Sequence, residues 1–278
     1  MATHRRSIRP IFGTLAVLPF ALLSFAAPVS ADSVDLTVTY SAKLAGIPVG
    51  RAKIEAHLND GDYSISGNGK VAGITALFAD GKGNVSVSGV LKDQLFQPTR
   101  YSQTIVDDEK KSVDMTFSGA RVVDITFTPP PKERNKDRKK KDDRKKRAER
   151  IPLTEEHKVG VIDPLSVFLL PAAELSGPGV CDRTLPLFDG EERFDVLLTF
   201  DKQVKRGKHD AFICRAAYRP IAGHRPDKDT VVFMAANKDM EVWLTPIGST
   251  GFVAPLEAHV KTQYGMLVIK ADKFQVGN

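Results

Sequence analysis

Alternation of apolar and polar side chains with a period of two runs through most of this chain and restricts its fold more than any other feature. Residues 34–41 place Val, Leu, Val and Tyr on one face and Asp, Thr, Thr and Ser on the other. Residues 50–58 repeat the alternation, and it resumes over 63–69 after a turn at Asn59-Asp60-Gly61. A period of two is typical of strands with one buried face, and an Asp-Gly turn between two such strands predicts a hairpin.

The same pattern predicts strands along the rest of the chain. Before residue 129 they cover 82–89, 100–106 and 111–127, the last divided by a turn at Ser118-Gly119. Short turns between neighbouring strands require antiparallel pairing. After residue 150 the predicted strands cover 193–201, 211–220, 230–236, 240–248 and 254–274, the last divided at Tyr264-Gly265.

One principal helix is expected between these two groups of strands. Asp163 is a favourable N-cap and Pro164 suits the first helical position, so the helix would run through PLSVFLLPAAEL, with Pro171 limiting or kinking it. We therefore expect a mainly β fold of about eleven strands, a curved antiparallel sheet or an open or partly closed β-barrel, with this helix packed against it. One domain over 32–278 is expected, and two stacked sheets divided near residue 150 are the alternative.

The N-terminus has the order of features of a secretory signal peptide. Three arginines precede an apolar run over 11–27, and small residues follow up to Ala31. This order predicts cleavage of residues 1–31 near Ala31 and a periplasmic protein with no transmembrane segment after processing. A retained membrane anchor is the alternative, although the apolar run is short for a span and contains Pro19.

Cys181 and Cys214 are the only cysteines, and both lie in the part of the chain that would be exported. An oxidising compartment with one pair and no odd thiol predicts a disulfide between them. Closing a loop of this length would stabilise the fold by roughly 3 to 4 kcal/mol. A redox-active pair is disfavoured because the C-x-x-C spacing is absent.

Residues 129–150, PPPKERNKDRKKKDDRKKRAER, hold 12 Lys and Arg against 5 Asp and Glu, an excess larger than the +6 of the whole chain. Because apolar residues are almost absent after Pro131, the segment predicts a disordered excursion. Such a cluster would suit nucleic acid in the cytoplasm, but export removes that partner. It would be either a solvated spacer or a contact for an anionic envelope surface, made through Lys139, Lys140, Lys141, Arg144, Lys145, Lys146 and Arg147.

Motifs of known catalytic and metal sites are missing from the sequence. It contains no H-E-x-x-H, no G-x-S-x-G and no Gly-rich phosphate loop, so we expect no catalytic residue, no metal and no cofactor. A hydrolase with dispersed residues is one alternative function, and it would require carboxylates such as Asp195, Asp201 or Glu241 to pair in space.

A ligand cavity agrees better with the predicted curved sheet, because such sheets can enclose apolar ligands. Leu77 and Phe78, in the apolar segment AGITALFADG (72–81), form a candidate ligand rim, and a short helix plugging the sheet is the alternative. Glycines that would permit bends and close backbone approach stand at 46, 50, 67, 69, 81, 83 and 89.

The leading functional hypothesis is a non-catalytic periplasmic protein that binds a lipid or another hydrophobic or amphipathic envelope ligand, or supports envelope maintenance. A structural interaction module is the alternative. It would contact an anionic envelope polymer or a protein partner through the basic segment and the FDG turn at 188–190.

Three stretches together resemble a known family. They are YSAKLAGIPVGRAKIEA (40–56), CDRTLPLFDGEERFDV (181–196), and CRAAYRPIAGH (214–224) followed by VWLTP (242–246). In this order they are similar to the exported proteobacterial proteins grouped as the domain of unknown function 3108 family. The resemblance implies a periplasmic β-rich protein without an assigned activity, and it carries over no catalytic residue.

Overall fold

One antiparallel sheet contains nearly all the predicted strands. The computed structural model describes residues 33–59, 61–71, 81–92, 95–130, 148–172 and 174–277. The chain divides into two units, 1–30 and 31–278, and every described residue belongs to the second. The sheet has 14 strands, ordered β7-β6-β5-β4-β3-β2-β1-β14-β13-β12-β11-β10-β9, with β8 paired to β13. Its edge strands are β7 and β9, so strand pairing does not close it into a barrel.

Each half of the sheet follows the chain order. The first half comprises β1 (Val34–Leu44), β2 (Ile47–Asn59), β3 (Asp62–Val71), β4 (Lys82–Lys92), β5 (Leu95–Val106), β6 (Lys110–Ser118) and β7 (Arg121–Thr128). The second half comprises β8 (Leu170–Pro171), β9 (Arg183–Phe188), β10 (Arg193–Arg206), β11 (His209–Ala222), β12 (Met240–Pro246), β13 (Phe252–Thr262) and β14 (Gly265–Gly277).

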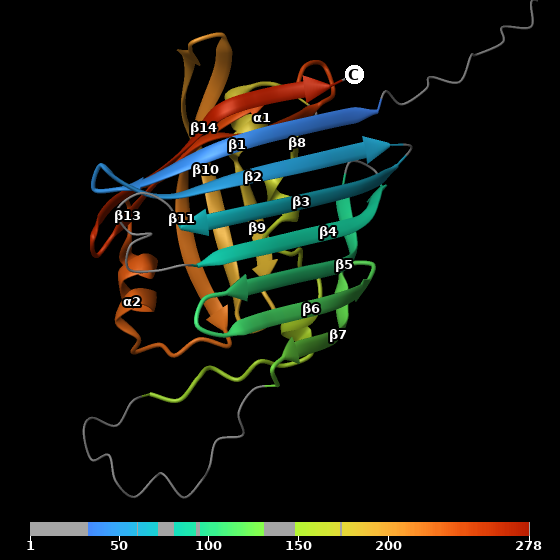
Figure 1. Cartoon of the computed structure of the whole chain (residues 1–278), viewed down its shortest axis with the longest axis vertical. Coiled ribbons are helices and arrows are strands. Elements are labelled where there is room, and N and C mark those ends of the chain that lie inside the picture. Colours follow the sequence, from blue (N-terminus) through green and yellow to red (C-terminus); the bar gives the residue numbers. More distant parts are fainter. Residues whose placement is uncertain are drawn as a thin grey trace, which may run out of the picture. The chain divides into compact units, whose positions relative to one another are not determined.

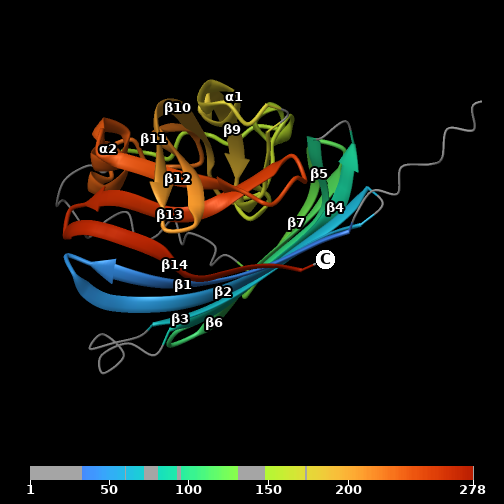
Figure 2. The same cartoon turned by 90° about the horizontal axis from the view of Figure 1, so that it is seen from above.

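The halves are joined where β1 pairs with β14, residues from opposite ends of the described chain. Figure 1 shows β1 to β7 side by side in one layer, with β9 to β11 crossing behind them. Seen from above in Figure 2, the sheet curves from β6 through β1 and β14 round to β9, so that its halves form separate layers. The expected mainly β, curved antiparallel sheet is confirmed.

The predicted helix beginning at Asp163 is wrong. A 3₁₀ turn over Ser166–Phe168 replaces it, followed by strand β8 and then by α1 (Gly177–Cys181). Asp163 does act as a cap, since its Oδ1 accepts the backbone N–H groups of Leu165 and Ser166, both at 2.9 Å. The helix does not continue because Pro171 cannot donate a backbone hydrogen bond and Leu170 instead pairs with β13.

A strand predicted over 230–236 is also wrong, because these residues form helix α2 (Asp229–Ala236). Short apolar runs rich in Val and Phe do not distinguish a strand from a buried helical turn by themselves. Asp229 lies in the first turn, where a carboxylate favours the helix, and Val231 is buried at 8% exposure.

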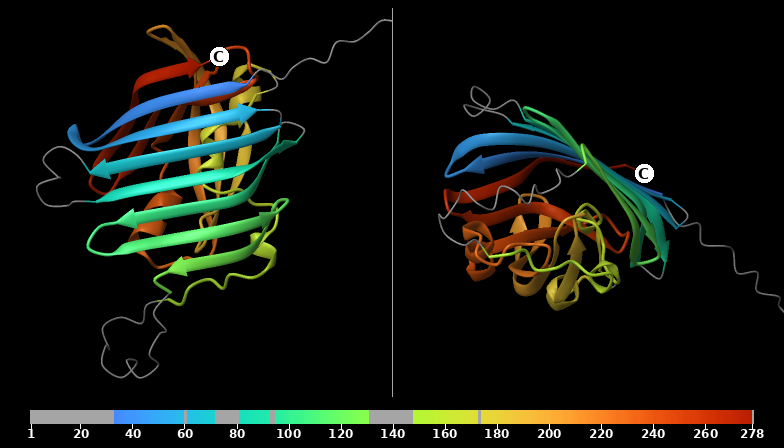
Figure 3. Two further views of the ribbon diagram at one scale, coloured as in Figure 1. Left: turned by 45° about the vertical axis from the view of Figure 1, so that its right-hand side comes forward. Right: turned by 90° about the horizontal axis from the view of Figure 1, so that it is seen from below.

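The edges of the sheet are bridged by the connection that follows β7, which we call the closing segment (residues 148–172). Gly160 N–H donates to Ala120 O beside β7 at 2.7 Å. Ile162 N–H then donates to Pro186 O of β9 at 2.9 Å, and Phe188 N–H donates back to Ile162 O at 3.0 Å. In Figure 3 the closing segment, in yellow-green, passes along the β7 edge.

The closing segment also supplies core side chains to both halves of the sheet. One apolar cluster joins the inner face of β1 to β7 to Val161, Leu165, Phe168 and Leu169. A second joins β9 to β13 to Leu170 and Ala172 of this segment, and also includes Val180 and Cys181 of α1. Much of the space within the curved sheet is therefore filled by the protein's own side chains.

Candidate functional site

Three rows of side chains cross β2, β3, β4 and β5 on the face that carries the core. The first row is Ala56, Ile65, Val87 and Tyr101, which are in register and at most 2% exposed. Residues two and four positions along a strand share a face, so the next rows continue this surface toward the strand ends. The second row is Ile54, Gly67, Val85 and Gln103, and the third is Ala52, Gly69, Gly83 and Ile105.

The two central positions of these rows carry large side chains in the first row and none in the third. The central positions change from Ile65 and Val87 to Gly69 and Gly83, which have no side chains to fill the surface. A hollow of ≈ 500 Å³ results, and we call it the glycine-lined hollow. Its apolar walls are Ala52, Ile54, Val71, Val85 and Ile105.

The hollow has the size and chemistry of a small-molecule site. Such sites typically occupy about 300 to 1,000 Å³, have mostly apolar walls and contain a few polar groups that orient the ligand. Ile105 remains 45% exposed on the open side, which is unusual for an isoleucine on the core face of a sheet. One of the polar groups that line it is the Gln103 amide, whose Oε1 accepts the Tyr101 hydroxyl at 3.2 Å. Burial raises the pKa of Tyr101 well above its ordinary value, so this phenol stays protonated as a donor.

A second, more polar pocket of ≈ 270 Å³ adjoins the hollow and shares Gln103 and Ile105 with it. Lys111 of β6 lines this pocket, opposite Ile105 in the register. Asp189 and Glu191, from the turn between β9 and β10, line it from the other half of the sheet. The inner face therefore changes from apolar to charged along one continuous surface.

The innermost end of this surface is held by a buried hydrogen-bond network. Ser166 Oγ donates to Asp163 Oδ2 at 2.5 Å and lies 2.9 Å from the Tyr63 hydroxyl of β3. Burial raises the pKa of Asp163, although hydrogen bonds from Ser166 and Leu165 oppose this shift. The network fixes the closing segment against β3, next to the first side-chain row.

Two sets of predicted contact residues lie outside the described residues. One is the candidate rim, Leu77 and Phe78, although Val71 and Gly81, on either side of their segment, both line the hollow and are joined by a 2.9 Å backbone bond. The other is the predicted anionic-surface contact, Lys139, Lys140, Lys141, Arg144, Lys145, Lys146 and Arg147. At the end of the basic segment, Ala148 N–H donates to Asp227 and Arg150 Nη1 donates to Gly223 O at 2.6 Å.

The predicted disulfide between Cys181 and Cys214 is present. It joins α1 to β11, and both cysteines are fully buried in the second core cluster. This position fits a structural role, because neither sulfur is accessible to a reactant.

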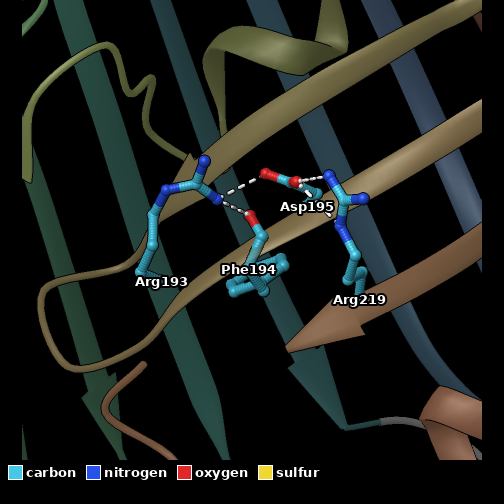
Figure 4. A network of polar contacts seen from close by, with 4 residues as sticks. All are labelled: Arg193, Phe194, Asp195 and Arg219. Atoms are coloured by element: carbon cyan, nitrogen blue, oxygen red, sulfur yellow. Dashed lines mark hydrogen bonds and ion pairs between the residues drawn. The ribbon is translucent and has the colours of Figure 1, made fainter. Parts of the chain in front are cut away.

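The carboxylates considered for a hydrolase do not pair with one another. Figure 4 shows Asp195 held between Arg193 and Arg219, with Arg193 Nη1 donating to Asp195 Oδ1 and Phe194 O, both at 2.6 Å. Burial acts to raise the pKa of Asp195, but hydrogen bonds and charge from Arg219 and Arg193 outweigh it, and the pKa is lowered. Asp201 faces Arg215 at 3.7 Å instead, and Glu241 faces His259 at 2.9 Å.

The FDG turn contributes to internal packing. Phe188 is fully buried in the first core cluster. Gly190 has φ +102, and a Cβ built there would stand 2.7 Å from Val113 Cγ2. The turn is pressed against β6, so Phe188 is not available to a partner.

The described residues also bear on metal and membrane sites. Among the described residues, no group of three His, Cys, Asp or Glu side chains lies close enough together to hold a metal ion. Among the helices that the structure describes, none has the length and apolar character of a membrane span.

Comparison with known proteins identifies the family. A family model described as "Protein of unknown function (DUF3108)" matches residues 37–272. The chain belongs to the DUF3108 family. The resemblance carried by its three sequence stretches is therefore confirmed, and the match extends from β1 to β14 and includes every element that builds the hollow.

A search of curated proteins found no match. A crystal structure of a beta-barrel-like protein of domain of unknown function DUF1849 from Brucella abortus is similar to this DUF3108 protein, with a TM-score of 0.48 and 14% sequence identity. The similarity covers 88% of this chain and 98% of that one.

The residues of the hollow were only partly foreseen from the sequence. The sequence marks its glycines as positions that permit close backbone approach, but no motif or spacing distinguishes Ile54, Val85, Gln103 and Ile105. Their common role depends on the cross-strand register, which brings residues up to about fifty positions apart into one row.

Proposed function

We propose that this DUF3108 protein binds a hydrophobic or amphipathic ligand of the cell envelope and is not an enzyme. The apolar part of the ligand lies in the glycine-lined hollow, against Ile54, Val85 and Ile105. The observation that carries this proposal is the loss of side chains at Gly69 and Gly83, directly beside a densely packed core.

Energetics supports a binding role for these glycines. Glycine inside a strand costs roughly 0.5 to 1 kcal/mol relative to alanine, because it loses more backbone entropy and packs no side chain. The backbone does not demand glycine at these two sites, since a Cβ at Gly69 would lie 3.5 Å from its nearest neighbour and one at Gly83 would lie 3.6 Å away. Larger side chains would fit there at the expense of the hollow.

The adjoining polar pocket supports an amphipathic ligand. A ligand lying along the inner face would have its apolar part against the walls up to Ile105. Its other end would reach Lys111, Asp189 and Glu191. These groups suit a polar or zwitterionic head because they present both signs of charge. The predicted signal peptide and the buried disulfide support a periplasmic location, where such ligands are abundant.

The test compares two valine substitutions on opposite faces of β4. Gly83→Val fills the hollow, whereas Ser86→Val adds the same side chain to the exposed opposite face. Titration with a fluorescent fatty acid should show saturable binding to the parent protein and to Ser86→Val, with at least roughly tenfold weaker binding to Gly83→Val. Native mass spectrometry of protein purified from its own periplasm should show a co-purified lipid with the parent protein and with Ser86→Val, but not with Gly83→Val.

Two results would contradict the proposal. Equal affinity of the two valine variants would place the ligand elsewhere on the molecule. Absence of binding by the parent protein, together with a ligand-free mass spectrum, would exclude an apolar ligand from the hollow.

A further inference from the structure

Strands β13 and β14 form a fork on the other half of the sheet. They pair from Thr262 and Gly265 as far as Glu257 and Lys270. Beyond this point β14 continues along β1 as far as Gly277, whereas β13 continues along β12. In the described chain, one edge of β14 is thus left without a strand partner after Lys270.

The tip of the β10–β11 hairpin lies beside this fork, and together they line an open pocket of ≈ 620 Å³. The His209 ring of the hairpin lies 5.3 Å from the Phe274 ring of β14, and both residues line the pocket. Leu256, buried at 6% exposure, also lines it. The pocket lining therefore contains two aromatic rings that pack against each other edge to face.

Glu257 contributes a buried carboxylate to this pocket, with its side chain only 6% exposed. Its Oε1 lies 2.8 Å from His259 Nε2, and His259 Nδ1 lies 2.9 Å from Glu241 Oε1. Its Oε2 has no hydrogen-bond donor and faces the Arg206 guanidinium at 3.5 Å. His259 thus holds the side chain in place, and the second buried oxygen keeps its hydrogen-bonding capacity while it faces the Arg206 charge.

Positive charge dominates the rim of the pocket. Lys208, Lys270 and Lys273 line it and are exposed, and none of them has an ion-pair partner in the described part of the chain. The second carboxylate on the rim, Asp272, already accepts a hydrogen bond from Ser41 Oγ at 2.9 Å. The lining therefore carries an excess of positive charge, which favours an anionic ligand.

We propose that the fork between β13 and β14 binds a sugar phosphate. The lysines of the rim take the phosphate, the Glu257 Oε2 that lacks a hydrogen-bond donor accepts a sugar hydroxyl, and the sugar ring packs beside Phe274 and His209. An inorganic anion alone would leave the Glu257 oxygen unsatisfied and would be repelled by it. A neutral sugar would leave the lysines unpaired. This site is independent of the glycine-lined hollow and shares no residue with it.

The experiment is isothermal titration of the parent protein with glucose 6-phosphate, glucose and inorganic phosphate at low salt. Glucose 6-phosphate should bind roughly tenfold or more tightly than either of the others, since it alone meets both parts of the site. Glu257→Gln should weaken glucose 6-phosphate by roughly tenfold and leave inorganic phosphate unchanged or slightly tighter. Lys273→Gln should weaken both anions, and the weakening should diminish as salt is raised.

Lys238→Gln serves as the matched control, because Lys238 is exposed and lines none of these pockets. A melting temperature within a few degrees of the parent value would show that each variant is folded. Failure of glucose 6-phosphate to bind the parent protein would overturn the proposal. Equal affinities for glucose 6-phosphate and phosphate, both insensitive to Glu257→Gln, would also overturn it, because they would show that no hydroxyl is recognised.

Discussion

Gly69 of β3 and Gly83 of β4 stand directly opposite each other in the sheet, and no side chain from either fills the inner face between Ala52 and Ile105. Two residues further along the same strands, Gly67 lies opposite Val85, and a further two along, Ile65 lies opposite Val87. The surface thus changes from packed core to open hollow within two rows. In the proposed function, the ligand enters the space that side chains at these two positions would otherwise fill.

Replacing Gly83 with valine should leave the protein as stable as the parent or more stable by up to about 1 kcal/mol, because a β-branched residue replaces glycine in a strand. The nearest atom to the new Cβ is Thr104 O at 3.6 Å, an ordinary contact. Urea unfolding followed by circular dichroism measures the change. A loss of more than 1 kcal/mol would mean that the hollow is needed for folding. Gly89→Val provides the contrast and should be strongly destabilised, since its Cβ would stand 2.2 Å from Gln97 O.

The disulfide, which lies in the second half of the sheet, should stabilise the folded protein. Replacing both Cys181 and Cys214 with serine should lower the free energy of unfolding by roughly 3 to 4 kcal/mol, because the unfolded chain regains the entropy of a loop spanning a sequence separation of 33. Unfolding of the parent protein with and without reductant should give the same difference. If reduction left the denaturation midpoint unchanged, this prediction would fail.

Asp163 should anchor the closing segment. Asp163→Ala removes the acceptor for the N–H groups of Leu165 and Ser166 and for the Ser166 hydroxyl, all buried. We expect a loss of about 2 to 3 kcal/mol, measured by urea unfolding. Asp107→Ala is the control, because Asp107 is exposed and accepts one N–H from Glu109, so its removal should change the free energy of unfolding far less than Asp163→Ala does. Equal effects of the two substitutions would argue against an anchoring role.

Asp195 should make stability depend on pH in a defined direction. Its pKa is lowered in the folded protein, so the unfolded chain binds the proton more readily. Its contribution is therefore fully present above the ordinary carboxyl pKa of about 3.9 and is lost as the pH falls through the lowered folded value. Asp195→Asn should cost roughly 2 to 4 kcal/mol at pH 7, the lower end reflecting the solvent exposure of Arg219.

The measurement is the free energy of unfolding of parent and Asp195→Asn from pH 7 down to about pH 3. The difference in free energy of unfolding between the two proteins should become smaller below about pH 4. Asp163 acts in the opposite direction, since its pKa is raised by burial, but it is common to both proteins and cancels in the difference. A gap that stays constant across this range would show that Asp195 does not stabilise through its charge.

Local sequence determined most of the strands and their turns. The period of two identified which residues of β1, β2 and β3 face the core, because side chains alternate by covalent geometry alone. Turns at Gly61, Gly119 and Gly265 were predictable because glycine adopts a positive φ without steric cost. Each of the three does have a positive φ in the structure. The disulfide was predictable because only two cysteines exist.

Tertiary structure decided the remaining features. Residues 230–236 became helix α2, and Asp163 capped a single 3₁₀ turn, because packing against the sheet outweighed weak local preferences. The hollow and the fork exist only through long-range register. Ala52 and Ile105 stand at the two ends of one row across four strands, and β13 and β14 separate beyond the Glu257–Lys270 pair. Local patterning specifies which face of a strand is buried, but it does not encode which distant strand lies beside it or where a pair of strands separates.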